Sequence, residues 1–235
     1  MIDTLLAQSS SDSTTTIEVV VWIVLVVGAV IGGYFAHRHR KKKIAQYRAW
    51  AAQYGFHYEP KDNSVVDISS KAPFGVGRNR RGQDVFRGSY RGLHILFFEY
   101  IYTTGSGKNS TTHVNQVVAI GLPSPRPFLD IGHETTMSRF FNSLGFASLQ
   151  FENQHFNDVF KVTAENPRFA YDVIHAQTME WMLADQRART FSWRFDGPWL
   201  MNVKKGKLKL EEVFFYADFL CDIYAQVPKF VWSNN

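Results

Sequence analysis

The chain has 235 residues, 45% of them apolar and 15% aromatic, so it can bury a sizeable core, and wholesale disorder is excluded. Its single cysteine, Cys221, excludes an intramolecular disulfide and a thiolate zinc cluster. The net charge of +5 is concentrated in residues 38–48, which hold six basic residues, whereas residues 49–235 hold 20 basic and 18 acidic ones. Because nucleic-acid binding needs a basic face on the folded domain, the counts favour no nucleic-acid partner.

Residues 17–36, IEVVVWIVLVVGAVIGGYFA, are predicted to form a transmembrane helix, since 20 residues span about 30 Å. The segment before this run is acidic and rich in Ser and Thr, and the segment after it reads HRHRKKK. A cleaved signal peptide has the opposite order of charges. The positive-inside rule therefore predicts a single-pass protein of the cell membrane, with residues 1–16 as a disordered extracytoplasmic tail and residues 37–235 in the cytoplasm.

Small residues line the second half of this helix. Gly28 and Gly32 have the GxxxG spacing that lets another helix approach closely, and Gly33 and Ala36 follow them. Glycine is also simply frequent in membrane helices, which is the alternative interpretation. On the first interpretation these residues pack against a second copy of the chain or against other integral membrane proteins.

A basic juxtamembrane helix is predicted for residues 37–55, ending at Gly55. The cations Lys41, Lys42 and Lys43 fix the membrane topology and would also attract anionic lipid. An apolar stripe that includes Tyr47 and Tyr54 suits either packing on the following domain, which we favour, or the membrane surface.

Residues 56–235 are predicted to form one domain. Strands are expected at 83–90, 93–104 and 112–122, with a flexible loop between the last two, and LPSPRP (122–127) is expected to be an extended connector. A short helix is expected at 135–144.

Strands and helices are also expected in the second half of this domain. NDVFKVT (157–163) reads as a strand, and Asn166 and Pro167 start a helix that runs past Ala176. TFSWRF (190–195) alternates as a half-buried strand, residues 196–198 turn the chain, and 199–203 return it. A final helix at 211–226 carries Cys221 as a core thiol. The predicted fold class is α+β: one N-terminal transmembrane helix, then a mostly antiparallel β-sheet domain with interspersed helices.

Several short motifs resemble a family of bacterial single-pass membrane-anchored proteins of unknown function. They are the FNxxFxV strand from Phe156 to Val162 with the helix after it, the TG-x-GK hairpin from Thr104 to Lys108, and Pro73, Phe74 and Gly77. Where that family commonly has an acidic residue near the helix start, this chain has Asn166. The resemblance implies a bacterial source and a membrane tether, and it brings no catalytic residue.

One further segment suggests a binding site. FGVGRNRRG (74–82) places Arg78, Arg80 and Arg81 in a glycine-rich turn, which either holds a phosphate or anionic lipid headgroup or is a solvated basic turn. The eight histidines are scattered and show no metal-binding spacing, and no nucleophile or nucleotide motif is present, so no catalytic residue, metal or cofactor is predicted.

Three functions fit these observations. The first, which we favour, is a non-enzymatic membrane-tethered interaction module or accessory subunit of a larger membrane protein complex. The second is a sensor or binder of anionic lipid or another amphiphile at the cytoplasmic leaflet. The third is a membrane-surface enzyme, which would need a deep pocket with convergent polar groups.

Overall fold

A computed structural model describes residues 2–133 and 147–233, and the chain divides into two compact units, Met1–Trp50 and Ala51–Asn235. The described residues of the first unit are all helical. Its helix α1 (Ile2–Tyr54) is unbroken from the first described residue, so residues 2–16 are helical here, although the sequence predicted a disordered tail. The helix ends before Gly55, which has φ 73° and closes the last turn within the second unit, where the Phe56 amide donates to the Ala51 carbonyl at 2.8 Å.

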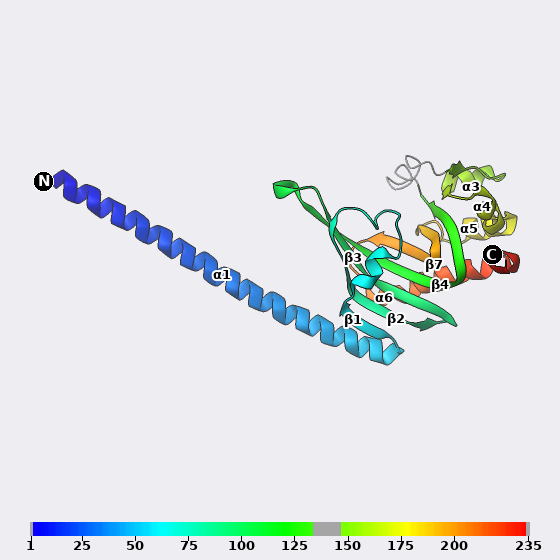
Figure 1. Cartoon of the computed structure of the whole chain (residues 1–235), viewed down its shortest axis with the longest axis horizontal. Coiled ribbons are helices and arrows are strands. Elements are labelled where there is room, and N and C mark those ends of the chain that lie inside the picture. Colours follow the sequence, from blue (N-terminus) through cyan, green and yellow to red (C-terminus); the bar gives the residue numbers. More distant parts are fainter. Residues whose placement is uncertain (1, 134–146, 234–235) are drawn as a thin grey trace. The chain divides into compact units, whose positions relative to one another are not determined.

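The second unit is built on a seven-stranded sheet in which every pairing is antiparallel (Figure 1). The strand order is β1-β2-β3-β4-β6-β5, and β7 also pairs with β4. The strands are β1 (His57–Lys61), β2 (Arg78–Tyr90), β3 (Leu93–Thr104), β4 (Thr111–Gly132), β5 (Ala147–Leu149), β6 (Lys161–Ala164) and β7 (Trp193–Lys205). The predicted α+β class, with an apolar N-terminal helix and an antiparallel sheet, is confirmed.

Three strands are longer than the sequence predicted. β2 begins at Arg78, whereas the strand was expected from residue 83. β4 continues through the proline-rich segment that was expected to be a connector, and β7 continues through residues 196–198, which were expected to reverse the chain. The β4–β7 pairing shifts register between Gly121 and Arg126 and again between Arg126 and Leu129. Prolines are tolerated in strands at such irregularities, because a ladder hydrogen bond is not needed there.

Five α-helices follow α1 among the described residues, and two of the predicted boundaries are wrong. They are α3 (Gln154–Val159), α4 (Pro167–Val173), α5 (Ala176–Ala184), α6 (Leu210–Gln226) and α7 (Lys229–Ser233). The predicted strand at 157–163 begins as α3, because the Asn153 side chain caps a helix there, and only its end is β6. Asn166 and Pro167 do start a helix, but it stops at Val173, before a separate α5. The helix predicted at 135–144 lies outside the described residues.

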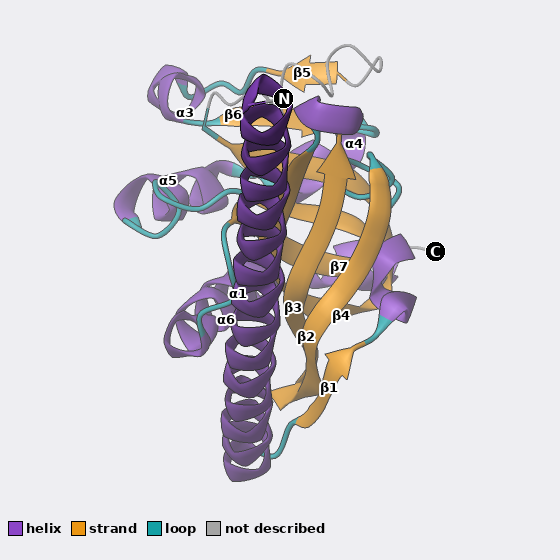
Figure 2. Ribbon diagram, turned by 90° about the vertical axis from the view of Figure 1, so that its left-hand side faces the viewer, coloured by secondary structure: helices purple, strands orange, loops and turns teal. Residues whose placement is uncertain are grey.

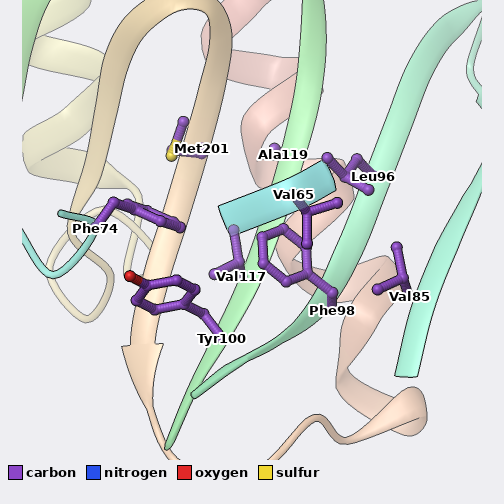
Figure 3. Close-up of a cluster of buried hydrophobic side chains, with 9 residues drawn as sticks. All are labelled: Val65, Phe74, Val85, Leu96, Phe98, Tyr100, Val117, Ala119 and Met201. Atoms are coloured by element: carbon purple, nitrogen blue, oxygen red, sulfur yellow. The ribbon is translucent and has the colours of Figure 1, made fainter. Parts of the chain in front are cut away.

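One face of the sheet is covered by residues 62–77, which include the short helix η1 (Asn63–Asp67). Val65 and Phe74 from this cover pack on side chains from four strands: Val85, Leu96, Phe98, Tyr100, Val117, Ala119 and Met201 (Figure 3). The rings of Phe74 and Tyr100 lie 4.5 Å apart. Burial of these aromatic and aliphatic side chains stabilises the folded domain, because such burial dominates the folding free energy.

The opposite face of the sheet is covered by α6, which packs on β3, β4 and β7 (Figure 2). Its buried stripe includes Val213, Ala217, Leu220 and Cys221, and the burial of Cys221 is as the sequence predicted. Two buried side chains of the sheet hold the chain that leads into α6. Glu99 accepts a hydrogen bond from the Leu208 amide at 3.1 Å, and Gln116 accepts one from the Lys209 amide at 3.0 Å. These bonds satisfy amides at the helix entrance.

Candidate functional site

The small residues predicted for helix packing lie on the exposed surface of α1. Val20–Tyr54 contains a run that is long and apolar enough to span a membrane by length and composition. Gly28, Gly32 and Ala36 follow one another at intervals of four residues, so they share one face of the helix. A Cβ atom built on Gly28, Gly32 or Gly33 would meet nothing within 4 Å. This face therefore has room for a partner helix to approach the backbone closely.

The predicted juxtamembrane cations also belong to α1. Lys41 and Lys42 are exposed, and the ammonium of Lys43 lies 4.8 Å from the centroid of the Tyr47 ring. At the end of the same helix, Tyr54 belongs to the second unit, where its ring lies 5.2 Å from that of Phe214. The end of the predicted stripe therefore packs within the domain.

The three arginines of the predicted basic turn form the beginning of β2. Asn79 has φ 53°, and the register with β3 shifts between Arg78 and Arg81, so this part of the strand is bulged. Arg78 donates to the hydroxyl of Ser110 at 3.0 Å, which ties it to the β3–β4 loop, and Arg80 lies 3.7 Å from the Asp67 carboxylate. Arg78 and Arg80 are exposed, and Arg81 is half-buried.

Three lysines that the sequence analysis did not select lie at the same end of the sheet. Lys108 is in the β3–β4 loop, Lys205 ends β7, and Lys207 follows it. Arg81 pairs with Ile101, Ile101 pairs with Val114, and the Val114 carbonyl accepts from the Gly206 amide at 2.9 Å. This row of pairings crosses β2, β3 and β4 and reaches Gly206, directly after β7. It therefore brings Arg81 to the same end of the sheet as residues more than 120 positions later in the chain. Sequence proximity contains no signal for this grouping.

A buried charged group lies on the face covered by residues 62–77. Arg194 is 4% exposed, donates to the Ala72 carbonyl at 2.7 Å, and lies over the rings of Phe74 and Phe128. Asp130 is its directly paired neighbour on β4. Desolvation raises the pKa of the Asp130 carboxyl to about 6, although the charge of Arg194 acts in the opposite direction.

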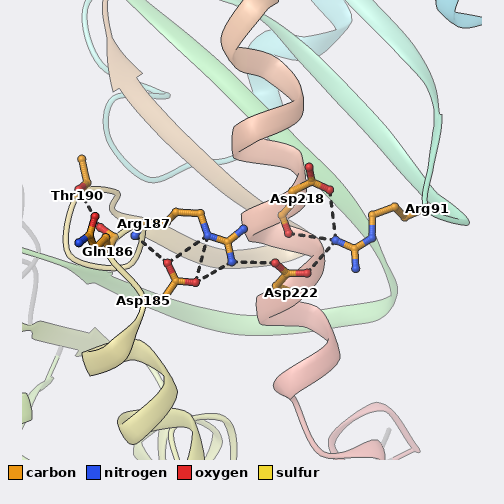
Figure 4. A network of polar contacts seen from close by, with 7 residues as sticks. All are labelled: Arg91, Asp185, Gln186, Arg187, Thr190, Asp218 and Asp222. Carbon is orange, nitrogen blue, oxygen red and sulfur yellow. Dashed lines mark hydrogen bonds and ion pairs between the residues drawn. The ribbon is translucent and has the colours of Figure 1, made fainter.

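A second charged network joins α6 to the loops around it (Figure 4). Arg187 contacts Asp185 at 2.6 Å and Asp222 at 2.8 Å, and Arg91 contacts Asp222 at 2.8 Å and Asp218 at 3.3 Å. The hydrogen bonds from Arg187 lower the pKa of the Asp185 carboxyl. Because each charge in this network has an opposite partner, its arrangement suits fastening α6 to the sheet and the loops.

Within residues 2–133 and 147–233, no group of three or more His, Cys, Asp or Glu side chains is placed to hold a metal ion. Cys221 is buried, and desolvation raises the pKa of its thiol to about 11. One pocket of about 260 Å³ brings polar groups together: Arg126, Asn166, Arg168 and Asp172, beside Pro127, Phe169 and Val231. It is open to solvent, and Asp172 opposes the charge of the two arginines.

The fold and these features define a chain with one candidate membrane-spanning helix followed by an antiparallel α+β domain. No protein-family model and no curated protein matches the sequence, so the family resemblance of the short motifs stays a prediction. The crystal structure of the mycobacterial trehalose monomycolate transport factor A is similar in fold, with a TM-score of 0.50 and 13% sequence identity. The match covers 77% of this chain and 94% of that one.

Proposed function

We propose that this protein is a membrane-tethered, non-enzymatic accessory module of a larger membrane protein complex, held to its partners through α1. The small-residue face of α1 carries this proposal. Gly28, Gly32 and Ala36 share one exposed face of a helix that is apolar enough to span a bilayer. In lipid, helices associate by close packing and not by hydrophobic burial, and small residues make that packing close.

The fold likeness supports an accessory role in transport. The protein with the similar structure is named as a factor for the transport of trehalose monomycolate. We extend this to a proposal that the host complex of the present chain is a membrane transport system, with residues 37–235 in the cytoplasm and residues 1–16 outside. The cations between Arg38 and Arg48 favour this orientation.

The experiment is a pull-down of tagged full-length protein from its native membrane in mild detergent, followed by mass spectrometry. We expect a stoichiometric set of integral membrane proteins, which is lost when residues 17–36 are replaced by polyleucine of equal length. That replacement keeps insertion but removes the small residues. A protein that purifies alone and monomeric, or a set of partners that survives the replacement, contradicts the proposal.

A further inference from the structure

We propose that the end of the sheet formed by Arg78, Arg80, Arg81, Lys108, Lys205 and Lys207, called here the basic end, docks on an anionic lipid bilayer surface. This is a second membrane contact, made by the folded domain and separate from α1. It does not depend on the partner complex proposed above, and none of the comparisons assigns it.

The basic end is assembled by strand pairing. Arg78 lies opposite Thr103 on β3, which lies opposite Thr112 on β4, and Asn115 of β4 lies opposite Lys205. Neighbouring strands are about 4.8 Å apart, so β2 and β7, three spacings apart, place Arg78 and Lys205 about 15 Å from one another across the width of the sheet. The β3–β4 hairpin, whose loop carries Lys108, projects beyond the rest of the sheet (Figure 1). Lys108 therefore lies on a projecting, convex tip, and the other cations lie at the start of β2 and the end of β7 beside this hairpin.

Most of this positive charge is not neutralised. Among the described residues, Arg80 has an ion-pair contact with Asp67 at 3.7 Å, and no carboxylate lies within ion-pair distance of the other five cations. Glu212, which is close in sequence, is already bound by Lys204 and Lys209. The near-neutral composition of residues 49–235 thus conceals a local excess of positive charge, which attracts an anionic surface.

The hairpin also presents aromatic groups beside the cations. Tyr102 and His113 stack with ring centroids 4.7 Å apart, and both are half-buried. The hydroxyl of Thr104 lies 2.7 Å from His113 Nε2, which holds the pair in place. Half-exposed aromatic rings next to Lys and Arg suit the headgroup region of a bilayer, where one side of the ring is apolar and the other is wet.

A bilayer fits this surface better than a folded protein partner does. A convex tip with flexible lysine side chains contacts a broad, fluid array of negative charge without needing a complementary shape. The candidate membrane span is in the same chain, so anionic lipid is present at high effective concentration.

The test uses the full chain in lipid nanodiscs, either of phosphatidylcholine alone or with about a third phosphatidylglycerol. An environment-sensitive fluorophore is attached at Ser106→Cys in the exposed loop, and the buried Cys221, with its raised pKa, stays unlabelled under mild conditions. A label at the exposed Ala225→Cys, at the other end of α6, is the control position. We expect a blue shift at position 106 in anionic discs only, which high salt abolishes, and no shift at position 225.

Charge variants complete the test. Lys108→Glu with Lys205→Glu should abolish the shift. Each reversal lowers the net charge by two units, so the pair lowers it by four, which corresponds to a loss of more than 100-fold in affinity for the anionic surface. The matched pair Arg168→Glu with Lys229→Glu changes the net charge equally at exposed positions elsewhere and should keep the shift. Equal emission in both lipids, or a shift that survives at Lys108→Glu with Lys205→Glu, overturns the proposal. So does loss of a co-purifying protein in that variant without any lipid effect, which would assign the basic end to a protein partner.

Discussion

Asp130 of β4 and Arg194 of β7 occupy directly paired positions on the face of the sheet that residues 62–77 cover. Thr163 of β6 lies opposite Asp130 in the same row. Arg194 is 96% buried, and among the described residues no hydrogen-bond acceptor lies within reach of its Nε or Nη2 atoms. The pair therefore places opposite charges side by side without a direct ion pair. Burial disfavours the charged form of both residues, which lowers the pKa of Arg194 and raises that of Asp130.

The raised pKa of Asp130, about 6 against an ordinary 3.8, predicts a specific pH dependence of stability. Between pH 4 and pH 6 the native state binds a proton that the unfolded state has released, so this group's contribution to stability is present at low pH and is lost as the pH rises. Asp130→Asn removes the ionisation. The unfolding free energy of the variant, relative to wild type, should rise by about 2 kcal/mol across this interval, out of about 3 kcal/mol for the whole titration.

Thermal unfolding of the full chain in detergent at a series of pH values measures this difference. The exposed Glu152→Gln serves as the matched control, because it also removes one carboxylate. A constant difference between Asp130→Asn and wild type from pH 4 to pH 7 would contradict the burial of an ionised Asp130.

Arg187 is predicted to stabilise the attachment of α6. It binds Asp185 and Asp222 at the same time, and its side chain is only 24% exposed. Arg187→Met keeps an unbranched apolar stem but removes the guanidinium, so it loses the contact of that group with the Phe219 ring and leaves two carboxylates without this partner. We expect a loss of about 1–2 kcal/mol, less than for a fully buried pair, measured by chemical unfolding. The exposed Arg168→Met should change stability much less, and an equal loss in both variants would show that the network contributes nothing specific.

Gly82 of β2 is required by the close approach of the residue 62–77 cover. A Cβ atom at this position would overlap the Asp62 carbonyl oxygen and the Val65 side chain, and backbone atoms cannot move aside cheaply. The Asp62 amide also donates to the Gly82 carbonyl at 3.2 Å. Gly82→Ala should therefore destabilise the domain by about 1–3 kcal/mol, whereas Ser89→Ala, at an exposed position of the same strand, should be close to neutral. Unfolding midpoints that agree for the two variants would exclude this steric explanation.

Local patterns predicted the elements that depend on local physics. Strand β3, the helix start at Asn166 and Pro167, and the final helix α6 each lie where the sequence indicated them. β7 was predicted as a hairpin because Asp196, Gly197 and Pro198 are typical turn residues, but pairing along the bulged β4 keeps the strand extended.

Of the two candidate sites, one depends on local spacing and the other on the pairing of strands that are far apart in the chain. The small-residue face of α1 depends on spacing within one helix, so the sequence was sufficient to select it. The sequence also selected Arg78, Arg80 and Arg81 of the basic end, because they are neighbours in the chain. Their grouping with the three lysines depends on register between β2, β3, β4 and β7, which the sequence did not indicate.

The small-residue face of α1 provides the sharpest prediction about function. Gly28→Ile with Gly32→Ile adds two branched side chains on the face that would contact a partner helix, and both residues are apolar enough to remain in a bilayer. We expect insertion to be unchanged and association with membrane partners, or between copies, to fall by at least tenfold, because closely packed backbones are forced apart. Val26→Ile with Val30→Ile changes the same helix on a different face with little change of shape, and it should leave association intact. Quantitative co-purification of the two variants from the same membrane decides the matter: if both retain partners equally, the close contact is not at Gly28 and Gly32, and α1 acts only as a tether.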